Sequence, residues 1–332
     1  MIATVWRQHR RMLMLLFTAY ALVTAAVVAS GVILRAYRAE NPGPDPQYTP
    51  GVCTSIECYA GSAIGWISGI VVLSIVVVGA VIGAVVTVRE LETRTYVLAF
   101  TQSASRFSWY GARVLVIFVP VSAAAGVLGA ALASIRVPAG NLFQGRFTQI
   151  VYLTWGPVTA AWMFAALMLG SVLGLLVKNS FAVPIAVVLA FLGIVVLGSA
   201  MRPHLAEAHV REEPLGTVWT GVGTPDGPEV FARYHDWLLS SGPVDATGQP
   251  VNQHELCPRW WTVERGDREP VTKRMTSEQE MVGCLRQHGA VTTVVYFHPD
   301  ESFWAIQLRE TGLLVLTGLI LLLPARWQLK RV

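Results

Sequence analysis

The sequence predicts an all-α integral membrane protein with six transmembrane helices and a small mixed extracellular insertion between the fifth and the sixth. Two observations lead to this fold class. Of the 332 residues, 53% are hydrophobic and only 14% are charged, whereas about a quarter of the residues of a soluble domain are charged. Six apolar runs are also long enough, at about 20 residues a span, to cross a bilayer. This composition excludes a soluble globular protein.

The six predicted spans follow the apolar runs in chain order. They cover residues 12–34, 64–88, 114–135, 151–177, 181–200 and 311–323. The last run is the shortest, so we expect it to extend outward through residues 303–308. The first run is too long for the core of a signal peptide and ends without a small-residue cleavage site, so we interpret it as a span. An even number of spans places both ends of the chain on one side.

The positive residues of the short loops and tails predict the orientation, because Lys and Arg accumulate on the cytoplasmic side. On one side fall Arg7, Arg10, Arg11, Arg89, Arg94, Arg106, Arg113, Lys178, Arg326, Lys330 and Arg331. The other side holds residues 41–60, 136–150 and 202–310, and the last of these has more Asp and Glu than Lys and Arg. We therefore expect cytoplasmic N- and C-termini. Aromatic residues fit two interfacial belts, with Trp66, Tyr152, Trp155 and Trp304 at outer ends and Trp6 and Trp327 at inner ends.

Residues 202–310 are the only segment large enough for a separate extracellular domain. Local patterns predict helices over residues 228–241 and 277–287, the second with a capping box, and a strand over 291–298. Gly- and Pro-rich stretches at 221–228 and 242–250 indicate loops. We expect Glu301 and Glu310, near Arg309, to form a solvated charge cluster rather than a pair across the outer mouth.

All four cysteines, Cys53, Cys58, Cys257 and Cys284, fall on the outer side in this topology. An even set in an oxidising compartment indicates two disulfides. Of the three possible pairings we favour Cys53–Cys58, which closes a small loop, and Cys257–Cys284, which would cross-link the insertion. Buried free thiols are the alternative.

Two features of the spans bear on mechanism. Glycines recur at four-residue spacing at Gly61, Gly65 and Gly69, at Gly79 and Gly83, and at Gly170 and Gly174. This spacing allows close helix packing within the subunit or across a dimer, although glycine is also simply common in membrane helices. No Asp, Glu, Lys or Arg lies near the middle of a predicted span, which argues against a proton- or ion-coupled transporter.

The sequence has no motif for its own catalysis. It lacks the phosphate-binding loop of ATPases, a serine nucleophile elbow and a zinc-binding His-Glu-x-x-His helix. Six histidines, His204, His209, His235, His254, His288 and His298, fall in the insertion without the spacing of a zinc site. We therefore expect surface histidines, no metal site and no enzymatic activity.

Residues 89–113 form a charged, partly amphipathic segment between two apolar runs. Because it is too polar to cross a bilayer, it is predicted to lie on one membrane face as a short helix half sunk in the interface. Trp6, Arg7, Arg10 and Arg11 precede the first span in a similar way. They fit either a surface helix attracted to anionic membrane lipid or a plain positive-inside anchor, and Trp6 favours the surface helix.

These residues carry a resemblance to a known family. The pattern Arg89-Glu90-Leu91-Glu92-Thr93-x-Thr95, followed by Thr101-Gln102-Ser103 and Arg106-x-x-Trp109, resembles the loop between the second and third spans of type-2 ATP-binding-cassette (ABC) exporter permeases, especially those of actinobacteria. The stretches Trp6–Arg10 and Phe297–Gln307 resemble the two extremes of the same permeases.

The resemblance implies a permease subunit of the bacterial plasma membrane. ATP and Mg would be bound by a separate nucleotide-binding ATPase, with no cofactor in this chain and no nucleic-acid partner. A second permease copy, most simply an identical one, would complete the assembly. The implied ATPase-coupling residues are Arg89, Glu90, Glu92, Thr95, Gln102, Arg106 and Trp109, and the implied connecting helix, residues 1–11, contains Trp6, Arg7 and Arg10. Glu90, Glu92 and Arg106 also fit a solvated helix end.

The predicted activity is efflux of a hydrophobic or amphipathic cargo, such as a drug, a lipid or a peptide. In this hypothesis residues 12–201 hold five spans and the coupling loop 89–113, residues 202–310 form the extracellular domain, and residues 311–332 form the sixth span and tail. Rigid second and fifth spans would carry the movement of the loop. A path between the first, second and fifth spans would be lined by Phe17, Tyr20, Thr24, Ser74 and Ser199. A membrane protein that signals through its extracellular domain, with nothing transported, is the alternative.

Overall fold

The computed structural model describes residues 2–40, 56–92, 105–136, 146–177, 182–215, 236–257 and 280–331. The chain divides into two compact units. The first comprises Met1–Leu205 and Trp304–Val332, and the second comprises Ala206–Phe303. The first unit is helical and the second contains a small sheet, so the predicted fold class is confirmed.

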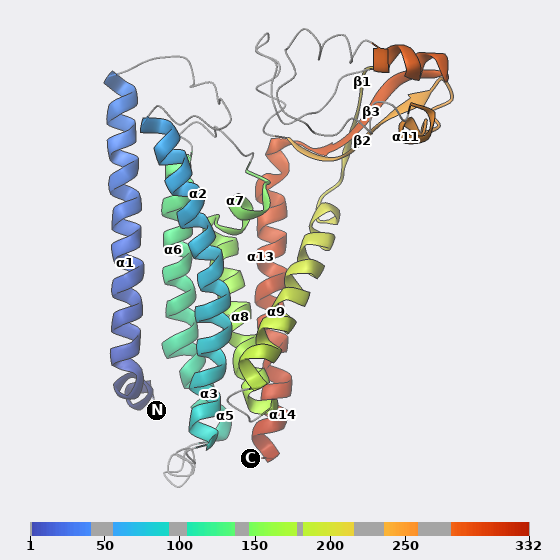
Figure 1. Ribbon diagram of the computed structural model, residues 1–332. Helices are drawn as coiled ribbons and strands as arrows, with labels where there is room; N and C mark the ends of the chain where they lie inside the picture. Colours follow the sequence, from blue (N-terminus) through green and yellow to red (C-terminus); the bar gives the residue numbers. More distant parts are fainter. Residues whose placement is uncertain are drawn as a thin grey trace. The chain divides into compact units, whose positions relative to one another are not determined.

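Six helices of the described residues are long and apolar enough to cross a membrane, as predicted. They are Ile2–Tyr37, Ser62–Val88, Arg106–Arg136, Gly156–Val177, Ala182–His204 and Asp300–Lys330. These helices run alongside one another in the first unit (Figure 1). The chain is therefore a multi-pass membrane protein.

The six spans are built from the following elements. The first is α1 (Ile2–Glu40), and the second joins α2 (Ile56–Ser74), a π-helical stretch η1 (Ile75–Ile82) and α3 (Gly83–Glu92). The third joins α5 (Arg106–Arg113), a second π-helical stretch η2 (Val114–Phe118) and α6 (Val119–Arg136). A short α7 (Gln149–Leu153) precedes α8 (Gly156–Val177). The fifth, α9 (Ala182–Met201), ends in a 3₁₀ turn, η3 (Arg202–His204), and the sixth joins α13 (Phe303–Ile320) and α14 (Leu322–Arg331).

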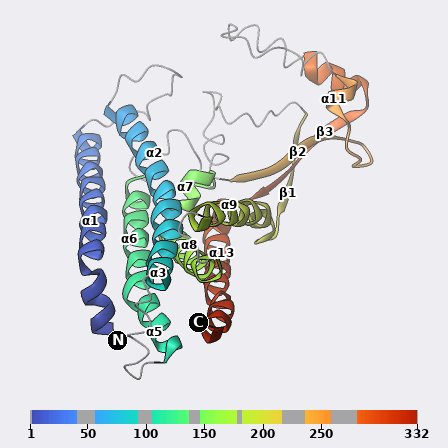
Figure 2. The same cartoon turned by 60° about the horizontal axis from the view of Figure 1, so that its bottom comes forward.

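The two ends of the bundle carry different elements, and we name them for what they hold. At the termini end α1 begins, α3 ends, α5 begins and α14 ends, and both chain termini lie there in two views (Figures 1 and 2). The opposite end, which we call the insertion end, contains α7 and the last turns of α6 and α9. There the chain leaves the first unit at Leu205 and returns to it at Trp304.

Pro120 accounts for the π-helical stretch in the third span. Proline has no backbone N–H, so an α-helical hydrogen bond to the carbonyl four residues earlier cannot form. Just before it, the Val119 N–H bonds instead to the carbonyl of Val114, five residues back. The wider turn lets the helix continue through the proline as a π-bulge.

The fourth span begins later than predicted. Instead of one helix from residue 151, α7 ends at Leu153 and α8 begins at Gly156, which has a φ of +26°. Pro157 favours a helix start here, because its missing N–H is not needed in a first turn. As a result Tyr152 and Trp155 are buried in the protein, so the prediction that they belong to an outer aromatic belt is wrong.

α8 is the central helix of the first unit. Most of its side chains are buried because α3, η1, α6 and α9 surround it. Glycines allow the closest approaches: a Cβ on Gly83 would lie 2.4 Å from the carbonyl oxygen of Leu167, and one on Gly79 would lie 2.6 Å from the Ala166 side chain. Gly65, on α2, has no such neighbour within 4 Å. Part of the glycine pattern thus serves packing inside the subunit.

The second unit contains a three-stranded antiparallel sheet with the order β1-β3-β2. Its strands are β1 (His209–Pro214), β2 (Trp237–Asp245) and β3 (Ala290–His298). The strand predicted over residues 291–298 is confirmed as β3. The helix predicted over residues 228–241 is wrong where the structure describes it, because residues 237–241 belong to β2. The first residues of the predicted loop 242–250, up to Asp245, also belong to this strand. β2 is an edge strand with a bulge near Leu238, and an edge strand tolerates Pro243.

A helix over residues 280–287 precedes β3 and packs near its first residue, Ala290. Cys284 on this helix forms a disulfide with Cys257, which confirms that pairing. The two cysteines share a hydrophobic cluster with Leu215, Leu285 and Ala290. The predicted Cys53–Cys58 pair lies outside the residues whose side chains the structure describes.

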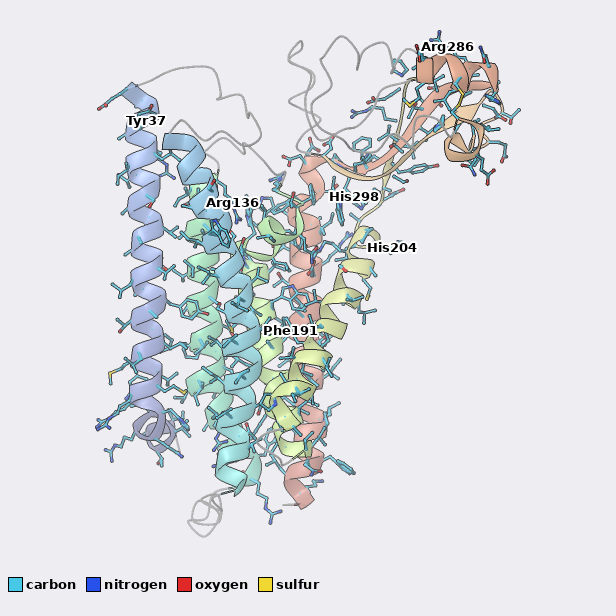
Figure 3. The ribbon with its side chains drawn as sticks, viewed as in Figure 1. Tyr37, Arg136, Phe191, His204, Arg286 and His298 are labelled. Carbon is cyan, nitrogen blue, oxygen red and sulfur yellow. A yellow bond between two sulfur atoms is a disulfide. The ribbon has the colours of Figure 1, made fainter. Side chains whose placement is uncertain are left out.

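Two polar side chains of this unit differ in their surroundings. His298, expected at the surface, is fully buried, and its Nδ1 donates to the carbonyl oxygen of Glu207 at 3.2 Å (labelled in Figure 3). Asp245 is partly exposed and caps the turn after β2. Hydrogen bonds from the Thr247 side chain and from the backbone of Gln249 and Thr247 hold the pKa of its carboxyl below the ordinary value.

Candidate functional site

α5 opens the third span at the termini end, in the region where the sequence predicts coupling. The hydroxyl of Ser105 caps the helix by accepting a hydrogen bond from the Ser108 N–H at 3.1 Å. Trp109 and Arg113 are buried on one face, with the guanidinium of Arg113 3.7 Å from the centroid of the Trp109 ring. Because both residues belong to α5, this stacking joins two side chains one turn apart on the same helix. The predicted coupling residue Trp109 thus lies on the buried face of α5.

Arg106 joins α5 to the last turn of α14. Its Nη1 donates to the carbonyl oxygens of Leu329 at 3.0 Å and of Lys330 at 3.2 Å. Carbonyls in the last turn of a helix have no partner within the helix and carry its negative dipole end, so a cation is favourable there. α5 also contacts α1. The predicted coupling residue Arg106 therefore lies where α14 meets α5.

α3 is held to the bundle by a buried polar contact and an apolar cluster. The hydroxyls of Thr87 and Ser171 lie 2.9 Å apart, which links α3 to α8. Val88, on the same helix, packs with Val183 and Val187 of α9. The end of the second span is consequently fastened to two other spans.

Other predicted coupling residues are placed only in part. The backbones of Arg89, Glu90 and Glu92 belong to the last turns of α3, but their side chains lie outside the described part of the structure. Thr95 and Gln102 fall entirely outside the described residues. Whether these residues gather around α5 therefore stays a prediction.

The predicted connecting helix is continuous with the first span in α1. Trp6, Arg7 and Arg10 are exposed on it, while Val5 and Leu13 are buried against the bundle. An exposed tryptophan next to exposed arginines is typical of a helix at a membrane surface.

Two of the predicted path residues meet in the structure. The hydroxyls of Tyr20 and Ser74 lie 3.1 Å apart and join α1 to α2. Thr24, one turn further along α1, donates to the carbonyl of Tyr20, and Phe17 is half-buried on the same helix. Ser199 lies on α9 and uses its hydroxyl within that helix. The structure thus groups the residues of the first two spans and leaves Ser199 on its own helix.

A buried ion pair at the insertion end was missed by the sequence reasoning. Arg202 donates from Nε to Oε2 of Glu310 at 2.8 Å and from Nη2 to Oε1 at 3.1 Å. Trp162 donates to the same Oε1 at 3.1 Å, and Arg202 also donates to Gln149 at 2.7 Å. Glu310 is only 4% exposed, so the prediction of a solvated charge cluster is wrong for this residue. The sequence does contain one signal for this ion pair, because Glu310 is an acidic residue at the start of an apolar run.

A second buried arginine, Arg136, organises the turn after α7. Its Nη2 donates to the hydroxyls of Ser68 at 2.6 Å and Thr154 at 2.7 Å, and its Nη1 donates to the carbonyl of Val151 at 3.1 Å (labelled in Figure 3). It is the last residue of α6, where the negative end of the helix dipole offsets the buried charge. Arg136 thereby ties α2, α6 and the α7–α8 turn together.

One group of the described side chains has the composition of a metal site. Ligand atoms of Cys257, Cys284 and His288 lie within 4.8 Å of one another. Both sulfur atoms are joined in the disulfide, and a disulfide cannot supply the thiolate that a metal needs. The group is therefore part of the cross-link of the second unit.

Comparison with known proteins identifies a family. No curated protein and no solved structure matches the chain. The family described as ABC-2 membrane transporter related matches residues 11–202, which cover most of the first five spans and end at Arg202 of the buried ion pair. Members of this family are membrane components of ABC transporters that generally work with an ATPase subunit. With more than half of its length matched, the chain belongs to the ABC-2 membrane transporter related family.

Proposed function

We propose that this chain is the permease subunit of an ABC exporter that moves a hydrophobic or amphipathic cargo out of a bacterial cell. A separate ATPase binds ATP and Mg and presses on the segment between α3 and α5 at the cytoplasmic face. Two copies of this chain, each with an ATPase subunit, form the working assembly. The termini end faces the cytoplasm and the second unit lies outside the cell.

The observation that carries this proposal is the junction at α5. A polar segment between two spans is followed by a capped helix that contacts α1 and is hydrogen-bonded to α14. A push on this helix therefore acts on three spans at once. The sequence supplies no phosphate-binding loop that would let the chain bind ATP by itself.

The cargo class rests on the chemistry of the spans. The Tyr20–Ser74 pair is a small neutral polar contact between largely apolar helices. A path of this kind suits a molecule with a large apolar surface and few polar groups. Dyes, lipids and apolar peptides are the compounds to compare.

Reconstitution tests the proposal directly. The chain is co-expressed with a candidate ATPase subunit, sought first in the neighbouring reading frames, purified as a complex and placed in liposomes. Three probes are compared: the amphipathic dye rhodamine 6G, a fluorescent phospholipid and a labelled apolar peptide. We expect ATP-dependent movement of at least one probe. ATP hydrolysis by an intact complex with no movement of any of the three contradicts the proposed export.

Two substitutions test the coupling segment itself. Glu92→Ala and Arg106→Ala are expected to leave the complex assembled while lowering the amount of probe moved per ATP hydrolysed. The matched control is Glu301→Ala, which removes an exposed carboxylate from the second unit. Full transport by both coupling variants would show that neither residue takes part in coupling.

A second candidate function follows from the second unit. It is a separate compact unit whose helix is cross-linked by the Cys257–Cys284 disulfide. Such a unit suits a sensor that an ATPase moves without any transport. Deleting residues 221–286 separates the two functions: loss of export in an assembled complex fits a lid over the path, whereas unchanged export favours a separate sensing role.

A further inference from the structure

The sixth span is hydrogen-bonded to α5 at one end. Arg106 holds two carbonyls in the last turn of α14, at 3.0 and 3.2 Å. The guanidinium is a charged donor, and the two carbonyls lie at the negative end of the α14 dipole, so the contact links α14 to α5.

α13 and α14 behave as one rod. They are separated only by Leu321, and the backbone bonds from Leu321 to Thr317 (3.0 Å) and from Ala325 to Leu321 (3.3 Å) continue the helical pattern through the break. Pro324 explains the break, because it cannot donate to the carbonyl four residues before it. The helical hydrogen bonds on both sides of this break make the sixth span a continuous connection between the two ends of the first unit.

The same rod is fixed at the insertion end. Glu310 of α13 accepts from Arg202 and from Trp162, and Gln307 donates to the carbonyl of Tyr152 at 3.2 Å. All of these side chains are buried. Movement of α13 along its axis therefore has to displace α7, α8 or the end of α9, because breaking the buried ion pair is costly.

Arg202 and Glu310 also flank the second unit in the chain. The unit comprises Ala206–Phe303, so its entry follows Arg202 closely and its exit precedes Glu310 closely. A shift of the ion pair is thus a shift of both connections to this unit.

We infer that the sixth span transmits movement of α5 to both connections of the second unit, with Arg106 as the positioning residue that engages it. This inference rests on the proposed export by a partner ATPase. It adds a route to the one predicted through the second and fifth spans, and it couples the ATPase to the segment outside the cell.

The test measures movement of α13 relative to α6 in the complete complex in liposomes. Spin labels are placed at Val127→Cys on α6 and Leu308→Cys on α13, both of which are 60% exposed. The distance between the labels is compared without nucleotide and after trapping with ATP and vanadate. The unsubstituted chain, carried through the same labelling, gives the background from the native cysteines. Transport of rhodamine 6G and ATP hydrolysis are measured on the same samples.

We expect the distance distribution of the labelled pair to shift on trapping and the shift to disappear in Arg106→Ala while ATP hydrolysis continues. Loss of two charge-assisted hydrogen bonds is expected to lower dye moved per ATP by about tenfold or more. Arg106→Lys, which retains a cationic donor, should keep part of the shift. Lys330→Ala should keep all of it, because the contact uses the backbone carbonyl of that residue.

The possible results separate the two proposals. A shift in Arg106→Ala equal to that of the parent, or ATP-driven dye transport by the parent without any shift, overturns the role of the sixth span and leaves export standing. A parent complex that hydrolyses ATP without moving any probe overturns both. If Arg106→Ala does not assemble, the Arg106→Lys comparison decides: a shift undiminished from that of the parent overturns the inference, and a reduced shift supports it.

Discussion

Arg202 and Glu310 form a buried ion pair with two hydrogen bonds, although 108 positions separate them in the sequence. The pair joins the end of α9 to α13 and accepts a third bond from Trp162 of α8. A buried pair of this kind does not add much stability compared with apolar residues, but its rupture leaves a charge without compensation. This asymmetry makes the pair a sensitive place to test the fold.

We predict that Glu310→Ala lowers the free energy of unfolding by about 3–5 kcal/mol, because the Arg202 guanidinium is left buried without its carboxylate. The measurement is thermal unfolding of the purified protein in detergent, followed by tryptophan fluorescence. Glu301→Ala is the control, since it removes an exposed carboxylate nine residues away. The double variant Arg202→Leu with Glu310→Leu should recover most of the loss. An unfolding temperature of Glu310→Ala equal to that of the control contradicts the burial of the pair.

The close approach of the second span to α8 gives the next prediction. Gly83→Ala places a Cβ within 2.4 Å of a backbone oxygen, which cannot move aside easily, so we expect a loss of about 1–3 kcal/mol. Gly65→Ala has no neighbour within 4 Å in the subunit and should leave its stability unchanged. Unfolding of both variants in detergent provides the comparison. Equal stability of Gly83→Ala and Gly65→Ala would argue against the tight contact.

The disulfide of the second unit gives a prediction about that unit alone. Cys257 and Cys284 close a loop with a sequence separation of 27, and a cross-link of this size stabilises by about 3–4 kcal/mol. We expect Cys284→Ser to open the unit to limited proteolysis while the spans stay protected. Peptide mapping without reductant should recover Cys257 and Cys284 in one linked peptide from the parent protein. Recovery of the two cysteines as separate free thiols would show that the pair does not form.

The parts of the fold that sequence reasoning predicted are those set by local composition. Each span is an apolar run long enough for a bilayer, and this is visible without knowing what lies beside it. The strand β3 was likewise predicted because its run of Val, Thr and aromatic residues is typical of a strand. β2 was missed because its bulge near Leu238 and its Gly242-Pro243 pair obscure the alternation that identifies a strand.

The contacts at the two ends of the sixth span could not be predicted from sequence in the same way. Arg106 was singled out from its charge and its place in the loop, but its partners are backbone carbonyls more than 200 positions away, and any residue supplies a carbonyl. Glu310 could be noticed as an acidic residue in an apolar run, yet its partner Arg202 depends on how α9 and α13 pack. Burial and pairing are properties of the tertiary structure, which composition alone does not determine.

The proposed orientation in the membrane gives the last prediction. With the termini end in the cytoplasm, a membrane-impermeant maleimide should label Val291→Cys in intact cells and label Lys330→Cys only after the cells are opened. Val291 is 60% exposed on β3, and Lys330 is exposed on α14, so both thiols are accessible to reagent on their own side. The parent chain serves as the control, because the disulfide between Cys257 and Cys284 leaves no thiolate there to react. Labelling of Lys330→Cys in intact cells would show that the topology is the reverse of the predicted one. In that orientation α5 would face away from any cytoplasmic ATPase.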